Sequence, residues 1–374
     1  MKITCDREKL LAAFQAVAAV APARSPKPIL QNVKLDVGDD GKATLFATDL
    51  EVSIRREVEG VEVETAGAVL LPVARFGAIL RESSDATFRI ETDGVKTLVR
   101  GERSRFNLPS ENPSEFPAAV DFDAQAYYQA PTRLLKEMIR RTLFATDNES
   151  SRYALGGVKF EIADDGKLIA VGTDGRRLAK MEGGIEKVGD AAAVGDATIV
   201  PMRSLQLIDR TLVDEEAPTR FAVRANDAVF ATPTATLSTR LLEGRYPKWR
   251  DVVPSRTDSA KVELTVGPFF AAVRQAAIVT SEESRGVDFA FGDGTLVLAG
   301  QAAEVGESHV ELPIGYDGDK IEITLDPRFL IDFLKTLDAE QSFTFDLVDS
   351  DSAAVANTDD GYTYVLMPLA RDRS

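Results

Sequence analysis

The sequence repeats itself at an interval of 125 residues, and this repeat limits the possible folds more than any other feature. An Asp-Asp-Gly-Lys turn at residues 39–42 recurs at residues 164–167, and Asp49, which ends the segment after the first turn, recurs as Asp174. A third, more diverged copy has Asp293-Gly294 at the corresponding place. This interval is too long for a solenoid repeat and has the size of a whole domain. We therefore expect three tandem copies of one domain.

Each copy combines two amphipathic helix-like segments with alternating strand-like segments. The helix-like segments are residues 10–14 and 75–80 in the first copy, 134–138 and 203–208 in the second, and 269–273 and 328–333 in the third. Residues 87–91 and 219–224 alternate apolar and polar side chains, which predicts half-buried antiparallel strands. The sequence thus predicts an α+β fold with two helices packed on antiparallel sheets in each domain. The expected domains are residues 1–125, 126–256 and 257–374.

The chain can bury several ordinary cores and has no recognisable membrane segment. It contains 374 residues, of which 44% are hydrophobic. No run approaches the roughly 20 apolar residues that a membrane span needs. The first 20 residues include the charged residues Asp6, Arg7, Glu8 and Lys9, where a signal peptide would be apolar. We therefore expect a cytoplasmic protein without a membrane partner.

Residues with catalytic or metal-binding chemistry are scarce. Cys5 is the single cysteine and alternates with Ile3, which indicates a small buried hydrophobe and excludes an internal disulfide. His309, the single histidine, stands in a strand-like segment, and the sequence has no Gly-x-Ser-x-Gly motif. The Gly-Lys pairs of the turns lack the pattern of a phosphate loop, and residues 349–351 lack the later ligands of a calcium loop. We expect no catalytic residues, no metal and no cofactor, and hence no enzyme.

The charges are divided unequally between helices and the rest of the chain. The net charge is −16, which by itself disfavours binding to nucleic acid. The six expected helices nevertheless carry a net charge of +7, so the remainder carries −23. If the helices share one surface, that surface can hold a polyanion. The alternative is that Lys and Arg merely suit exposed helix positions.

Eight short motifs, in their order along the chain and together with the triplication, resemble the beta subunit family of bacterial DNA polymerase III, the bacterial sliding clamps. The motifs are Pro28-Ile29-Leu30, Thr48-Asp49-Leu50-Glu51, Arg103-Ser104-Arg105-Phe106, Arg152-Tyr153, Thr173-Asp174-Gly175-Arg176-Arg177-Leu178, Gly244-Arg245-Tyr246-Pro247, Arg285-Gly286-Val287 and Tyr364-Val365-Leu366-Met367-Pro368. The resemblance implies a ring-forming head-to-tail homodimer whose helices line a central hole. It also implies a replication processivity factor that encircles double-stranded DNA and tethers the replicative polymerase, the clamp loader and repair proteins through short linear peptides.

The resemblance further implies three sets of functional residues. The peptide-binding cleft would be formed by Leu155, Thr173, Gly175, Arg176, Leu178, Pro247, Val252, Phe329, Val365, Leu366, Met367, Pro368 and Leu369. The DNA-binding residues would be Arg24, Arg75, Arg133, Lys136, Arg140, Arg152, Tyr153, Arg203, Arg210 and Arg274. The dimer interface would contain Arg103, Arg105, Phe106, Leu108, Ile278 and Val279, with the arginines facing acidic residues such as Glu304.

The sequence departs from the family pattern in three places. Arg176 stands where many members have histidine, so the rim of the cleft is permanently charged. Glu149 and Ala154 stand where some members have aromatic or amide residues that face DNA, and residues 370–374 form a longer and more polar end. Two other functional classes stay open at this point: an enzyme with an unrecognised carboxylate site, and a scaffold that kept the triplicated fold only to bind peptides.

Overall fold

The computed structural model describes residues 1–147, 153–191, 194, 198–256, 258–282 and 284–370. The chain forms two compact units. The first comprises Met1–Leu135, Ile185–Ala193 and Arg203–Leu241, and the second comprises Lys136–Gly184, Val194–Met202 and Leu242–Ser374. The middle repeat therefore contributes to both units.

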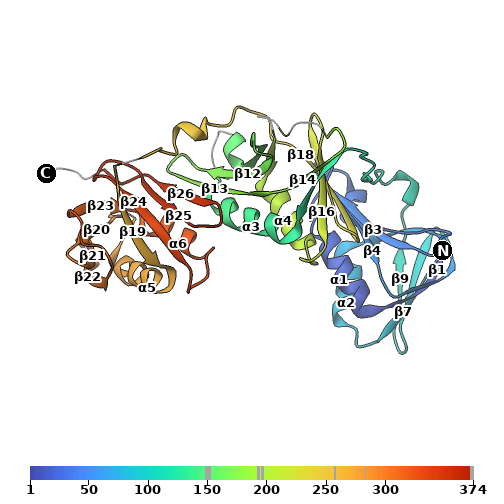
Figure 1. Ribbon diagram of the computed structural model, residues 1–374. Coiled ribbons are helices and arrows are strands. Elements are labelled where there is room, and N and C mark those ends of the chain that lie inside the picture. The colour runs from blue at the N-terminus through green and yellow to red at the C-terminus, as the bar shows by residue number, and fades with distance from the viewer. Residues whose placement is uncertain (148–152, 192–193, 195–197, 257, 283, 371–374) are drawn as a thin grey trace. The chain divides into compact units, whose positions relative to one another are not determined.

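The same order of elements occurs three times along the chain (Figure 1). Each repeat has a strand, a helix and three strands, and then again a strand, a helix and three strands; the first two repeats add one short strand between these halves. The α-helices among the described residues are α1 (Arg7–Ala18), α2 (Val73–Glu82), α3 (Thr132–Thr142), α4 (Met202–Thr211), α5 (Val266–Ala276) and α6 (Pro327–Leu334).

The strands also recur in the same order in each repeat. The first repeat has β1 (Lys2–Asp6), β2 (Asn32–Val37), β3 (Ala43–Thr48), β4 (Val52–Val58), β5 (Val61–Thr65), β6 (Gly67–Pro72), β7 (Thr87–Thr92), β8 (Lys96–Arg100) and β9 (Arg105–Pro109). The second has β10 (Tyr127–Pro131), β11 (Gly157–Ile162), β12 (Lys167–Thr173), β13 (Arg177–Gly184), β14 (Glu186–Val188), β15 (Ile199–Pro201), β16 (Pro218–Val223), β17 (Asp227–Ala231) and β18 (Ala235–Arg240). The third has β19 (Ala260–Thr265), β20 (Val287–Gly292), β21 (Thr295–Ala302), β22 (Gly306–Pro313), β23 (Ile321–Leu325), β24 (Ser342–Leu347), β25 (Ala354–Asn357) and β26 (Tyr362–Leu366).

Within each repeat, the two halves exchange the strand that precedes their helix. In the first repeat β1 pairs with β7 of the second half, and β6 pairs with β2 of the first half. The second repeat pairs β10 with β16 and β15 with β11, and the third pairs β19 with β24 and β23 with β20. This exchange ties the two halves of each repeat together and confirms the predicted triplication.

Strand pairing also joins neighbouring repeats inside each unit. In the first unit β4 pairs antiparallel with β18, which gives a nine-stranded sheet, and in the second unit β13 pairs antiparallel with β26, which gives an eight-stranded sheet. Both junctions follow one rule. The last strand in the first half of one repeat, β4 or β13, pairs with the last strand in the second half of the next repeat, β18 or β26. Two strands remain at the corresponding position, β9 and β22, and each is an edge strand of its sheet among the described residues.

Local sequence explains the turns and the helix starts. Gly41 and Gly166 have φ angles of 81° and 83°, and in the third repeat Asp293 and Gly294 have φ angles of 51° and 72°. A tight hairpin requires this left-handed backbone, which glycine adopts without strain, and so the acidic-glycine turn recurs. The Asp6 side chain accepts a hydrogen bond from the backbone N–H of Lys9 at 2.9 Å and thereby caps α1.

Aromatic side chains fill the space between the helices and the sheets. Phe14 of α1 packs edge-on against Phe76 of α2 with ring centroids 5.1 Å apart, and Phe269 of α5 lies 5.7 Å from Phe343 of β24. The predicted α+β fold, with two helices on antiparallel strands in each repeat, is therefore confirmed. Within the described ranges, no helix has the length and apolar character needed to span a membrane.

Candidate functional sites

The single cysteine is a structural residue, as its position in the first strand predicted. Cys5 is 1% exposed, and its thiol donates a hydrogen bond to the backbone oxygen of Phe88. Burial raises the pKa of the thiol to about 12, which disfavours the thiolate that a nucleophile needs. His309 lies exposed on β22, with Nε2 at 3.0 Å from Oε1 of Glu311. In the part of the chain that the structure describes, no group of three or more His, Cys, Asp or Glu side chains could hold a metal ion.

An apolar cluster covers one face of the eight-stranded sheet in the second unit. We call five of its sheet residues, each at most 5% exposed, the apolar floor: Ile169, Val171, Leu178, Val355 and Val365. The segment after β18 packs onto this floor through two buried aromatic side chains, Tyr246 and Trp249. The Tyr246 hydroxyl donates a hydrogen bond to the backbone oxygen of Val171 at 2.8 Å, which anchors the segment to β12.

A tight turn between β12 and β13 stands at one end of the floor. The Asp174 carboxylate accepts hydrogen bonds from the backbone N–H groups of Arg176 and Arg177 at 2.9 and 3.0 Å, and Gly175 takes the left-handed backbone at φ 88°. The backbone N–H of Met367 donates to the Arg176 oxygen at 3.0 Å. The turn and the end of β26 are therefore fixed side by side.

Arg177 holds the turn against α6 and is nearly buried. Its guanidinium lies 2.8 Å from an oxygen of Asp332 and donates to the backbone oxygen of Phe144 at 2.7 Å. The same group stacks on two aromatic rings, 4.4 Å from the centroid of Phe329 and 5.2 Å from that of Phe144. Cation–π contacts and ion pairs of this kind fix the position of Phe329 beside the turn.

Accessible apolar side chains border the floor. Val252 and Met367 are each 44% exposed, which is unusual for large hydrophobic residues. Pro247, Phe329 and Pro368 are half-buried. Extended peptides bind to surfaces of this kind by inserting apolar side chains.

The equivalent junction in the first unit is polar. At the positions of Leu178 and Val365, which face each other across the β13–β26 pair, the β4–β18 pair has Ser53 and Ser238. Met367 corresponds to Arg240, whose backbone N–H donates to the oxygen of Glu51 at 2.9 Å as that of Met367 does to Arg176. The same backbone framework thus carries an apolar surface at one junction only.

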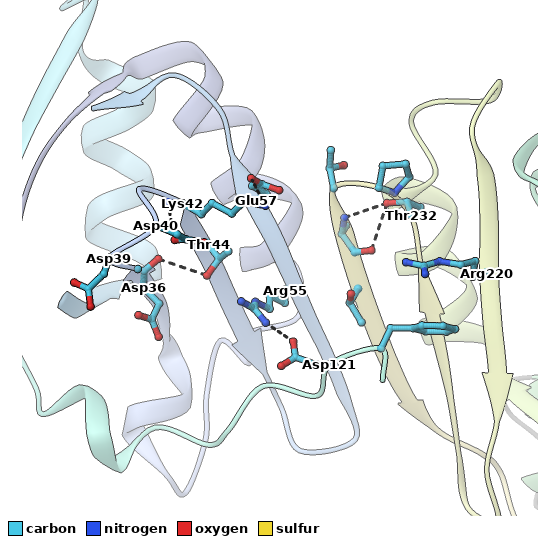
Figure 2. Close-up of a pocket in the computed structure, with 16 residues that line it drawn as sticks. Asp36, Asp39, Asp40, Lys42, Thr44, Arg55, Glu57, Asp121, Arg220 and Thr232 are labelled. Carbon is cyan, nitrogen blue, oxygen red and sulfur yellow. Dashed lines mark hydrogen bonds and ion pairs between the residues drawn. The ribbon is translucent and has the colours of Figure 1, made fainter. Parts of the chain in front are cut away.

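A polar cavity of about 660 Å³ in the first unit serves to anchor a linker (Figure 2). Figure 2 shows Arg55 of β4 directed at Asp121, with which it forms an ion pair. Arg220 stacks over the ring of Phe122 at 4.9 Å, and Lys42 lies 3.9 Å from Glu57. Since its cations are engaged by neighbouring carboxylates and rings, this cavity holds residues 121–122 in place.

The predicted DNA-binding residues lie mainly on helices. The α-helices with the observed bounds carry net charges of +1, +1, +3, +1, +1 and 0 in chain order, which again amounts to +7. Six of the arginines are exposed on these helices: Arg75, Arg133, Arg140, Arg203, Arg210 and Arg274. Lys136 is half-buried on α3, and Arg24 is exposed but follows α1 instead of belonging to it. Arg203 is also engaged by Asp49, with 2.7 Å between nitrogen and oxygen.

The predicted dimer residues lie on and beside the two unmatched edge strands. Phe106 is half-buried on β9, Arg105 is exposed at the start of this strand, and Arg103 is exposed two residues before it. Ile278 is 74% exposed in the single turn that follows α5, and Val279 next to it is half-buried. Such exposure of a large hydrophobic side chain marks a contact surface when it lies next to an open sheet edge.

Comparison with known proteins agrees with this architecture. Sequence models of the DNA polymerase III beta subunit match the chain in three successive parts: the N-terminal domain over residues 1–121, the central domain over 129–248 and the C-terminal domain over 250–370. The chain belongs to the beta subunit family of bacterial DNA polymerase III.

Relatives of this family match the chain over almost its whole length. The beta sliding clamp of Chlamydia pneumoniae is 31% identical over 370 residues, which is 99% of both chains. A crystal structure of the Pseudomonas aeruginosa sliding clamp bound to griselimycin superposes with a TM-score of 0.90 at 27% identity, covering 99% of this chain and 100% of that one. The Bartonella birtlesii clamp bound to griselimycin gives the same TM-score at 25% identity and the same coverage.

Two residues predicted for the cleft point elsewhere. Leu366 is fully buried and pairs with Arg177 and Ala354, so it faces the opposite side of the sheet from Val365. Leu369 donates its backbone N–H to the oxygen of Thr324 at 2.9 Å and lines a different cavity beside β20 and β23. Leu155, Thr173 and Leu178 are buried beneath the accessible surface.

Some predicted positions lie outside the described residues. These are Glu149, Arg152 and residues 371–374, and the side chain of Tyr153 is likewise not described. Ala154, in contrast, belongs to the apolar cluster around the floor. Leu108 is 7% exposed and is thus already packed within its own chain.

Sequence reasoning missed Arg177, Tyr246 and Trp249 as residues that build the site. Arg177 and Tyr246 lie in the motifs Thr173–Leu178 and Gly244–Pro247, but nothing in the sequence indicates that Arg177 stacks on Phe329. A signal was present for Trp249, because it is the only tryptophan in the chain and stands next to the Gly-Arg-Tyr-Pro motif.

Proposed function

We propose that two copies of this chain close head to tail into a ring around duplex DNA, and that the ring tethers the replicative polymerase, the clamp loader and repair proteins. The protein acts by encircling DNA and catalyses no reaction. The proposed domains are residues 1–125, 126–256 and 257–374; the order of the three family matches supports three domains, although the third match begins at residue 250. Family membership supports this function over that of a scaffold that binds peptides without DNA.

The observation that carries the ring is the pattern of junctions between repeats. The pairs β4–β18 and β13–β26 follow one rule, and the same rule leaves β9 of the first repeat and β22 of the third unmatched. Applied between two copies, the rule pairs β9 of one with β22 of the other. Two such head-to-tail junctions close a dimer, because each copy offers one strand of each kind.

The equivalent junction inside the chain indicates the contacts. Tyr364 of β26 pairs with Ala179 of β13 and lies 5.8 Å from Phe144, the second residue after α3. Phe106 pairs with Val99 of β8 as Tyr364 pairs with Ala356 of β25, so Phe106 occupies the position of Tyr364 in its repeat. Ile278 is the second residue after α5. Phe106 of one copy therefore packs on Ile278 of the other.

The same equivalence sets the register of the charged residues. Gly172 and Gly300 take equivalent positions, since each approaches the last backbone oxygen of the preceding helix, and they pair with Ala179 and Ser308. Phe106 then faces Ser308, and Arg105 faces His309 between Glu307 and Glu311. These two glutamates, in place of Glu304, are the acidic partners of Arg105.

Charge reversal tests this junction. Arg105→Glu should convert the dimer to monomers in light scattering, and Arg105→Glu combined with Glu307→Arg and Glu311→Arg should restore it. Ile278→Asp should also give monomers, whereas Val213→Asp, a change at a 66% exposed residue on the loop after α4, should not. Dimers that persist in both Arg105→Glu and Ile278→Asp would overturn the proposed ring.

Basic helix surfaces support DNA binding without sequence preference. Arginines that contact phosphate through long side chains provide affinity that depends on salt and not on base sequence. A closed ring needs little such affinity, because it leaves DNA only by opening a junction or by reaching a free end. Long residence and free sliding are therefore compatible, and the tether raises the local concentration of the polymerase.

The apolar floor and its rim support a peptide-binding cleft. Leu178, Val365 and Met367 make this junction apolar where the equivalent junction has Ser53, Ser238 and Arg240. Methionine adapts to different side chains, which suits a site that several partners share. Each chain offers one such cleft, so partners occupy it in turn.

A further inference from the structure

A second cavity adjoins the apolar floor, between β11 and the segment that follows β18. It has a volume of about 570 Å³ and is lined by Lys159 and residues 244–251. Tyr246 and Trp249 belong both to this lining and to the cluster on the floor, and Pro247 belongs to the proposed cleft. The cavity and the cleft are thus built on the same segment.

One buried carboxylate in this region is shared by two cations. Lys159 is 5% exposed, and its Nζ lies 3.0 Å from Oε2 of Glu161, while a guanidinium nitrogen of Arg250 lies 2.5 Å from Oε1. Burial alone would raise the pKa of Glu161, but hydrogen bonds from Lys159 and Arg250 hold it below its usual value. Glu161 therefore stays ionised between the two cations.

Two further cations line the cavity without a carboxylate of their own. Arg245 and Lys248 are exposed, and neither makes an ion pair with any described residue. Arg245 and Lys248 bring two positive charges to the cavity lining, in which Asp251 brings one negative charge. These two exposed cations contrast with the net charge of −16 of the chain.

We propose that this cavity binds a carboxylate of the peptide whose apolar side chains occupy the cleft. The proposal rests on the function proposed above and specifies its partner: a short peptide with an acidic group near its hydrophobic anchors. A carboxylate would form charge-assisted hydrogen bonds with Lys248 and Arg245, which are the strongest class available at a partly exposed site.

The strand positions set the spacing of the acidic group. Lys159 pairs with Val171, and Val171 pairs with Lys180, which is two residues from Leu178 along β13. Two strand spacings and two residues along a strand amount to about 12 Å. An extended peptide covers about 3.4 Å for each residue, so the acidic group lies roughly three or four residues from the anchor over Leu178.

Three labelled synthetic peptides test the proposal by fluorescence anisotropy. All three carry adjacent leucine and phenylalanine anchors. The first has aspartates four residues to either side of the anchors and an amidated end. The second has asparagines there and an amidated end, and the third has asparagines and a free carboxylate as its end. If the first peptide binds more tightly than the second, a side-chain carboxylate is the ligand. If the third binds more tightly than the second, the terminal carboxylate is the ligand.

We expect the first or the third peptide, whichever carries the preferred carboxylate, to bind wild-type protein about fivefold more tightly than the second at low salt. The ratio of the two dissociation constants should fall as salt screens the charges. Arg245→Glu with Lys248→Glu should reduce the ratio to one or below. The matched control is Lys261→Glu on the opposite edge of the same sheet, six strands or about 29 Å from β11; it should leave the ratio unchanged.

The outcomes separate this proposal from the cleft itself. Equal binding of all three peptides to wild-type protein, or a ratio that survives Arg245→Glu with Lys248→Glu, overturns the carboxylate site and leaves the cleft in place. A failure of every peptide to bind wild-type protein overturns both.

Discussion

Truncating the two exposed apolar side chains at the cleft should weaken peptide binding without disturbing the fold. Val252 and Met367 are each 44% exposed, so roughly half of each side chain is free to be buried by a peptide. Full burial of such a side chain is worth about 1.5–3 kcal/mol. About half of that, roughly 1 kcal/mol for each residue, gives about 2 kcal/mol for Val252→Ala with Met367→Ala. This corresponds to roughly a 30-fold increase in the dissociation constant.

The choice of these two residues follows from burial. Leu178 is 2% exposed, so Leu178→Ala would cost about 2–5 kcal/mol of folding stability and would confound a binding assay. The matched control is Arg240→Ala, which alters the equivalent position at the polar junction. Affinity is measured by anisotropy of a labelled clamp-binding peptide, and folding by thermal melting. A double variant that melts like wild type and binds within about threefold of it would refute the cleft.

Two further predictions concern DNA and acid stability. Arg133→Glu with Arg210→Glu should weaken DNA binding equally for different base sequences, while the dimer stays intact in light scattering. The slope of the logarithm of the binding constant against the logarithm of the salt concentration should become shallower by about one for each lost phosphate contact. Weaker binding to only one base sequence would contradict this prediction. Burial raises the pKa of Asp360, but hydrogen bonds from Thr358 and Arg141 outweigh burial and hold it below its usual value. Its stabilising effect is thus complete at neutral pH and is lost as the pH falls through the carboxylate range. Asp360→Asn should lower the melting temperature at pH 7 and flatten its decline between pH 5 and 3, and parallel curves would contradict this assignment.

The fold could be predicted because each repeat states its own pattern. Acidic-glycine turns, alternating strands and amphipathic helices recur at a fixed interval, and local chemistry is sufficient to place them. Polarity at the junctions could not be predicted in this way. Leu178 and Ser53 take equivalent positions in their repeats, but the polarity of each junction depends also on the partner strand. These partner strands, β26 and β18, come from distant parts of the chain.

Side-chain direction and long-range contacts are the features of the site that the sequence could not predict. The predicted cleft contains both Leu366 and Val365, but neighbours on a strand face opposite sides of the sheet, and only the observed register shows which of them faces the floor. Arg203 is predicted to bind DNA, and its ion pair with Asp49, a residue far away in the sequence, could not be predicted. A variant truncated from residue 365 onward would also lose peptide binding, but it would lack the end of β26, which lies in the middle of the eight-stranded sheet. Substitution of Met367 is therefore the better test of the cleft.

Retention on circular DNA tests the central claim most directly. Protein loaded by a clamp loader onto nicked circular DNA should stay with the DNA during gel filtration at about 0.5 M salt, where phosphate contacts are largely screened. Cutting the circle once should release it, because a ring slides off a free end. Equal retention on circular and linear DNA, or equal loss from both, would contradict the account that this chain holds DNA by encircling it.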